Sequence, residues 1–69
     1  MKKQVFIEGM SCQHCVNRVA EALKEIAGVK TVDVDLKGKY AIVEADRQID
    51  DGEIENAIEE AGYDVVKIE

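Results

Sequence analysis

The two cysteines are the residues of this sequence best suited to chemistry. Cys12 and Cys15 are its only thiols, and two residues separate them. They are too close in the chain for a disulfide between them to restrain the unfolded chain usefully. Thiolate sulfur is a preferred protein ligand of soft metal ions such as Cu(I). The pair is therefore a candidate site at which two thiolates share one soft metal ion, although redox and zinc proteins use the same spacing.

The segment around the second cysteine has the apolar spacing of an amphipathic helix that begins near Gln13. Its apolar positions are Val16, Val19, Ala20, Leu23, Ile26 and Ala27. Cys12 would lie in the preceding loop and Cys15 in the first turn. The free N–H groups at a helix start stabilise negative charge, so we expect a lowered pKa for the Cys15 thiol. Two ligands also leave the ion undersaturated, so a thiolate from a partner can add before an original one leaves.

The rest of the pattern predicts four strands and a second helix. Alternating apolar residues indicate strands over 3–8, 32–36, 40–45 and 65–68, with a tight turn at 37–39. Gly28 is the expected stop of the first helix and Gly62 that of the second. Asp50 and Glu53 resemble an acidic capping box at the start of the second helix. Ile49 and Ile54 could form the hydrophobic staple beside it.

The element order is β-α-β-β-α-β in a chain of 69 residues. So short a chain has room for one domain, residues 1–69, and one modest core. Two right-handed crossovers then favour the ferredoxin-like fold of the α+β class. It is an open-faced sandwich in which a four-stranded antiparallel sheet carries both helices on one face.

The loop at residues 9–15 reads Gly-Met-Ser-Cys-Gln-His-Cys, and a Gly-Tyr pair precedes the last strand. With the element order, these features resemble the heavy-metal-associated domain family, and its bacterial copper chaperones in particular. The likeness covers essentially the whole chain. It implies Cu(I) bound by Cys12 and Cys15. It further implies ligand exchange with the matching Cys-x-x-Cys of the metal-binding domain of a copper-transporting P-type ATPase.

Three side chains near the motif have more than one interpretation. Met10 could be a thioether ligand, but the resemblance places it in the core beneath the loop, where methionine fills irregular gaps. His14 could bind metal; at a helix start it is expected to point away from both sulfurs and could tune the site electrostatically. Tyr63 is either a core ring or, by the resemblance, a hydroxyl that shields or bonds a cysteine sulfur.

Other functions fit the residues less well. A dithiol oxidoreductase of the thioredoxin type is disfavoured because the sequence contains neither proline nor tryptophan. Structural zinc takes four ligands, whereas this chain offers two thiols and one doubtful imidazole. The loop chemistry barely separates copper from cadmium or mercury as a carried metal, and a zinc carrier is a further alternative. A regulatory metal-binding domain of a heavy-metal transporter also remains open. No catalytic constellation is visible, so we do not expect an enzyme.

Charge is distributed unevenly along the chain. The net charge is −6, which argues against nucleic acid as a partner. Residues 1–43 carry seven basic and five acidic side chains, whereas residues 44–69 carry two basic and ten acidic ones. The second helix is therefore strongly acidic, and Glu55 and Glu59 are candidates for docking a basic partner surface. Arg18, one turn after Cys15, is a candidate for docking an acidic one. Simple solubility is an equally good interpretation of the acidic charge.

The first apolar run, residues 5–7, is far too short for a signal peptide or a membrane span. We therefore expect a cytoplasmic protein with reduced thiols and no membrane insertion. The metal-free chain is expected to be a monomer, and copper could bridge two copies.

Overall fold

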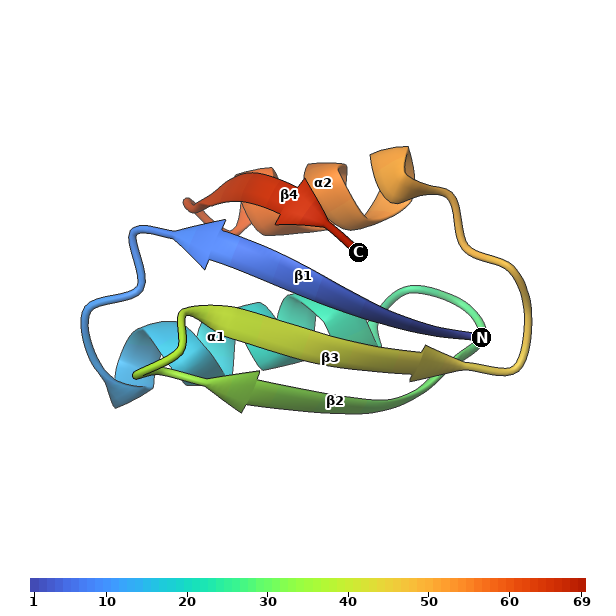
Figure 1. Ribbon diagram of the computed structural model, residues 1–69, viewed down its shortest axis with the longest axis horizontal. Coiled ribbons are helices and arrows are strands. Elements are labelled where there is room, and N and C mark those ends of the chain that lie inside the picture. The colour runs from blue at the N-terminus through green and yellow to red at the C-terminus, as the bar shows by residue number, and fades with distance from the viewer.

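The computed structural model describes residues 1–69 and has six elements in the order β-α-β-β-α-β (Figure 1). The strands are β1 (Lys2–Glu8), β2 (Val29–Asp35), β3 (Tyr40–Ala45) and β4 (Asp64–Ile68), and the helices are α1 (Gln13–Lys24) and α2 (Asp51–Glu60). All four strands and both helices predicted from the sequence are present.

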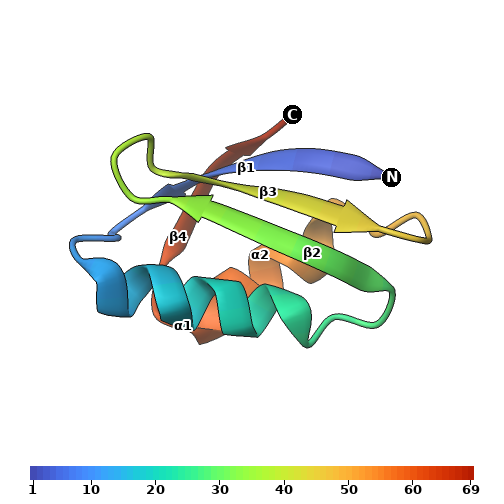
Figure 2. The ribbon, with the colours of Figure 1, turned by 90° about the horizontal axis from the view of Figure 1, so that it is seen from below.

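The strands form one antiparallel sheet in the order β2-β3-β1-β4. Both helices lie on the same side of it, and the other side is left open (Figure 2). This is the ferredoxin-like open-faced sandwich, so the predicted fold class is confirmed. The β1–α1 loop, which holds the cysteines, lies at the opposite end of the molecule from the β3–α2 loop (Figure 1).

The core lies between the sheet and the helices. Alternate residues of β1, such as Val5 and Ile7, point into it and are at most 1% exposed. Helix α1 contributes Leu23, and α2 contributes Ile54 and Ile58; all three are fully buried. Burying one such side chain stabilises the fold by about 1.5–3 kcal/mol, so both helices are held mainly by their apolar stripes.

Helix α1 ends earlier than predicted. Its last residue is Lys24, and the segment up to β2 consists of turns closed by Ile26 N–H to Leu23 O and Val29 N–H to Ile26 O, both 3.2 Å. The expectation that Gly28 stops the helix is therefore wrong. Gly28 instead has φ +95°, and a Cβ there would lie only 2.7 Å from the side chain of Arg47. It shapes the turn into β2 beneath that arginine.

Helix α2 begins after Asp50, as the sequence predicts, but the predicted capping hydrogen bonds are absent. Asp50 is the N-cap residue with φ −68° and ψ 143°, yet its side chain makes no capping hydrogen bond. The Glu53 carboxylate pairs with Arg47 at 3.1 Å rather than reaching back to the helix start. The expected capping box is therefore absent. Ile49 and Ile54, the expected staple pair, are both fully buried in the core.

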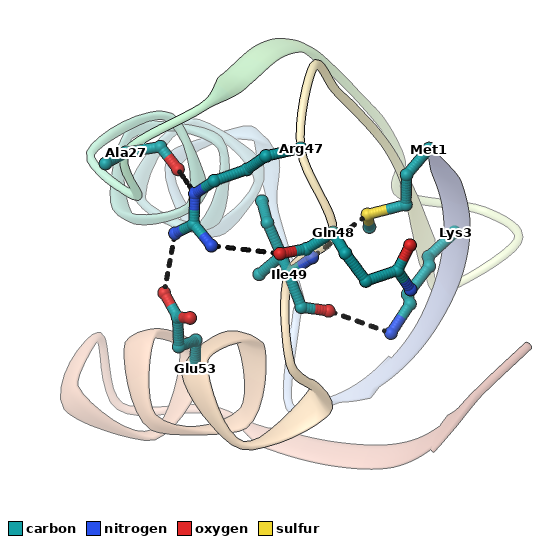
Figure 3. Close-up of polar contacts among 7 residues, drawn as sticks. All are labelled: Met1, Lys3, Ala27, Arg47, Gln48, Ile49 and Glu53. Carbon is teal, nitrogen blue, oxygen red and sulfur yellow. Dashed lines mark hydrogen bonds and ion pairs between the residues drawn. The ribbon is translucent and has the colours of Figure 1, made fainter.

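Arg47 joins three segments at the end of the molecule away from the cysteine loop (Figure 3). Its Nε donates to Ala27 O at 2.7 Å, one Nη to Gln48 O at 3.0 Å, and the other to Glu53. Close by, the Lys3 ammonium donates to Ile49 O at 3.0 Å. These contacts tie the end of the α1–β2 turn and the first turn of α2 to the β3–α2 loop.

Candidate metal centre

The cysteine loop passes directly into α1. Cys12 is the N-cap residue, with extended backbone (φ −159°, ψ 175°), and its carbonyl accepts from Cys15 N–H at 3.0 Å. Cys15 therefore lies in the first helical turn, as the sequence predicted. Cys12 is exposed, Cys15 is partly exposed, and both are free thiols. Both sulfurs can thus meet an incoming ion from solvent.

The two sulfurs lie 3.9 Å apart. Metal–sulfur bonds of about 2.3 Å, the length typical of zinc thiolates, let two sulfurs that share an ion lie up to about 4.6 Å apart. The observed separation therefore permits one ion between them with a bent S–metal–S angle. The structure contains no group of three or more His, Cys, Asp or Glu side chains that could hold a metal ion. The cysteine pair thus offers two ligands and no third, which suits a soft ion of low coordination number.

The Cys15 thiol is unusually acidic, with its pKa lowered from 9.0 to about 6. The largest cause is the backbone N–H of Ser11, which donates to the Cys15 sulfur, and the second is the hydroxyl of Tyr63. The Ser11 hydroxyl adds to this at 3.8 Å. At neutral pH a thiol of this pKa is roughly nine-tenths ionised. Cys15 is therefore ready to bind a cation without first losing a proton.

Tyr63 is brought to the cysteine loop by the end of α2. Gly62, at φ +99°, donates to Glu59 O at 3.0 Å, and Tyr63 N–H donates to Ile58 O at 3.1 Å. This pair of bonds is the Schellman motif, which favours glycine at the left-handed position. The Tyr63 ring is 9% exposed and lies 3.4 Å from where a Cβ on Gly9 would be. Tyr63 is thus both a core ring and a neighbour of the loop.

The hydroxyl of Tyr63 connects Cys15 to Arg18. Its hydrogen bond to Cys15 is the main reason that the pKa of Tyr63 is raised. The guanidinium of Arg18 acts in the opposite direction, through its charge and a hydrogen bond. The sequence placed Arg18 one turn after Cys15 and made it a docking candidate. Its contact with Tyr63 was not predicted, because that contact depends on where α2 ends relative to α1.

The remaining candidate residues fall into two groups. Met10 is 7% exposed and belongs to the core, whereas His14 is exposed at the start of α1. Glu55 and Glu59 are exposed on α2. A groove of about 600 Å³ also runs between the helices, and acidic side chains from both line it: Glu21, Glu25, Glu53 and Glu60. Arg18 also lines this groove. The sequence analysis predicted an acidic surface on α2 but did not predict that Glu21 and Glu25, at the end of α1, contribute to it.

The sequence pattern of the heavy-metal-associated domain matches residues 4–64. This chain belongs to the heavy-metal-associated domain family. It is 47% identical to the copper chaperone CopZ of Enterococcus hirae over 64 residues, which span 91% of this chain and 93% of that protein. Identity to the copper chaperone CopZ of Staphylococcus aureus is 43% over 61 residues, 87% of this chain and 90% of that protein.

Solved structures of other heavy-metal-associated domains have the same fold. A CopZ metallochaperone superposes with a TM-score of 0.89 at 39% identity, covering 96% of this chain and all of that one. A copper-binding domain from HMA7, a P-type ATPase, superposes with a TM-score of 0.86 at 34% identity, covering 100% of this chain and 99% of that domain. Neither helix of the present domain is long and apolar enough to cross a membrane.

The acidity of Cys15 in this heavy-metal-associated domain gives a first prediction. In a Cys12→Ser background, alkylation of Cys15 by iodoacetamide should rise with pH around a midpoint of about 6. Adding Tyr63→Phe removes a donor that favours the thiolate, so the midpoint should move upward toward 9.0, the ordinary thiol value. Tyr40→Phe is the matched control, because the Tyr40 hydroxyl donates to Asp35 rather than to a sulfur. An unchanged midpoint in Tyr63→Phe would contradict the assigned contact.

Proposed function

We propose that this chain is a cytoplasmic copper chaperone. Residues 1–69 form one heavy-metal-associated domain that carries a single Cu(I) ion on the thiolates of Cys12 and Cys15. The ion passes by ligand exchange to the metal-binding domain of a copper-transporting P-type ATPase. The observation that carries the proposal is the pair of free, accessible sulfurs 3.9 Å apart at the start of α1.

Several features of the site support transfer rather than storage. The ion would have two sulfur ligands and no third His, Cys, Asp or Glu side chain to complete its shell, so a partner thiolate can enter before either cysteine leaves. Cys15 lies in the first helical turn, where the Ser11 N–H and the Tyr63 hydroxyl favour its ionised form. Met10 then serves as core packing under the loop, and the Tyr63 hydroxyl favours the ionised form of Cys15. His14 remains exposed beside the pair and is not assigned as a ligand.

This chain resembles both the chaperones named CopZ and a copper-binding domain of a P-type ATPase. The first likeness suggests this chain as the copper donor, and the second suggests an ATPase domain as the acceptor. Donor and acceptor would share one fold, so their metal loops can approach face to face. We propose that Arg18 and the acidic residues Glu55 and Glu59 contribute to docking around that approach. The role is one of binding and delivery, without catalysis of a covalent reaction.

A second candidate is a regulatory metal-binding domain of a heavy-metal transporter. The observation that favours it is the likeness to the HMA7 domain, which spans nearly the whole of both chains. The cysteine site would be the same in both cases. Only the direction and speed of copper exchange with a separate ATPase domain would differ.

Metal competition tests the proposed cargo. The reduced protein should bind one Cu(I) per chain and keep it when Zn(II) is present in excess, because two thiolates satisfy Cu(I) but leave zinc two ligands short. The measurement is the metal content per chain after gel filtration from a mixture of both ions. Retention of zinc in place of copper would contradict Cu(I) as the cargo.

A further inference from the structure

One face of the sheet, on the side away from the helices, is left open (Figure 2). A continuous row of side-chain contacts crosses all four strands on this face. Asp35 of β2 is paired with Tyr40 of β3, Tyr40 with Phe6 of β1, and Phe6 with Lys67 of β4. Directly opposed residues point to the same face of a sheet, so these four side chains stand side by side. We call them the cross-sheet row.

Neighbours in the cross-sheet row contact one another. The Tyr40 hydroxyl donates to Asp35 Oδ2 at 3.3 Å, and the Phe6 and Tyr40 rings lie 6.0 Å apart between centroids. The Lys67 ammonium lies 4.9 Å from the centroid of the Phe6 ring. The row therefore has an exposed acid at one edge, two aromatic rings in the middle and an exposed base at the other edge. When a second copy of the row is laid against it in the opposite order, the acid of each row therefore faces the base of the other.

We propose that a second copy of this chain packs on the open face about a twofold axis that runs parallel to the strands. That axis exchanges β2 with β4 and β3 with β1, because the sheet order is β2-β3-β1-β4. Each Lys67 then faces the partner's Asp35, and the aromatic rings face one another. An interface of this kind uses the same patch twice, as closed dimers do.

Of the other charges on the face, the pair Lys2 and Glu44 agrees with this arrangement, whereas Glu69 does not. Lys2 and Glu44 are paired across β1 and β3, so the same axis sets each Lys2 opposite the partner's Glu44. A twofold axis perpendicular to the strands would instead set Asp35 against Asp35 and is disfavoured. Glu69 would face the partner's Asp33, a like charge, and its ion pair with Lys67 at 2.9 Å offsets that repulsion while competing with the partner's Asp35 for Lys67.

The pair should be weak and reversible. The molecule measures 30 × 20 × 18 Å, so the open face offers at most about 600 Å² per copy, the lower end of specific interfaces. Each copy also carries a net charge of −6, which opposes association. The expected monomer therefore dominates in dilute solution. Because the axis runs parallel to the strands, both cysteine loops lie at the same end of the pair and remain free, unlike in a copper-bridged dimer.

Sedimentation velocity of the reduced, metal-free protein with a chelator tests this inference independently of copper binding. Between about 10 μM and about 1 mM, the concentrations that separate moderate from very weak binding, the mean sedimentation coefficient should rise. Lys67→Glu should weaken association roughly tenfold or more, since like charges then face each other. Lys24→Glu is the matched control: it makes the same charge change on α1 and should have little effect.

Mixing two variants provides the decisive comparison. Lys67→Glu and Asp35→Lys should each associate poorly alone, but an equal mixture should recover, because each acid then faces a base in the mixed pair. Circular dichroism checks that Asp35→Lys is folded, since Asp35 also accepts from Gly38 N–H at 2.9 Å in the hairpin turn. A sedimentation coefficient constant up to about 1 mM, or equal losses in Lys67→Glu and Lys24→Glu, would overturn the proposed interface.

Discussion

Replacing either Cys12 or Cys15 by Ser is expected to abolish tight Cu(I) binding. The two sulfurs are 3.9 Å apart and no other cluster of metal-binding side chains exists to replace one of them. A hydroxyl is a hard, weakly acidic ligand that Cu(I) does not favour. The loss should exceed the roughly 10–100-fold that changes to outer-shell partners cause at metal sites. Competition with a chelator of known Cu(I) affinity measures it.

Met10→Leu is the matched comparison within the same loop. Met10 is 7% exposed and belongs to the core, so its thioether is directed to packing rather than to solvent beside the sulfurs. Exchanging methionine for leucine in a core conserves volume and costs less than about 1.5 kcal/mol. Copper affinity should therefore change little. A loss as large as that of a cysteine variant would show that Met10 is a third ligand and that the two-thiolate site is wrong.

The positions of the elements and of the cysteine pair could be predicted because they depend on short-range patterns, and the handedness of the crossovers then limited the fold. Alternation placed the strands, the apolar stripe placed the start of α1 near Gln13, and the spacing of Cys12 and Cys15 fixed their relation to that helix. The Schellman glycine, Gly62, was also visible as a stop signal. Each of these depends on residues within about one or two helical turns of each other.

The features that were missed depend on contacts between distant segments. Arg47 takes Glu53 away from the predicted capping box and packs over Gly28, so one side chain accounts for the Glu53 half of the missing capping box and fills the space above that glycine. The link from Cys15 through Tyr63 to Arg18 likewise joins the end of α2 to the start of α1. Arg18 and Tyr63 are 45 positions apart in the chain, so no local sequence pattern predicts that they lie close together.

Reversing the charge of two acidic residues on α2 is expected to slow the transfer of copper strongly. If the exposed Glu55 and Glu59 dock against basic side chains of an ATPase metal-binding domain, Glu55→Lys combined with Glu59→Lys should slow copper transfer to that domain. Electrostatic steering changes association rates by roughly 10–1,000-fold, so a decrease of at least about tenfold is expected at low salt. Stopped-flow transfer from the copper-loaded protein to the purified ATPase domain of the same organism measures this rate.

A salt series and a matched variant distinguish docking through α2 from an effect of the net charge of the protein. Between about 0.02 and 0.5 M salt the screening length falls from roughly 20 Å to roughly 4 Å, so the steered rate should fall across the series. The α2 variant should show a weaker salt dependence than the unmodified protein. Asp33→Lys with Glu44→Lys changes the net charge equally but on the open face of the sheet, away from the helices, and should transfer copper nearly as fast as the unmodified protein. If both double variants slow transfer equally, only the net charge of the protein affects the rate. A transfer rate that does not change with salt would instead mean that the partner is recognised by apolar contacts around the cysteine loop.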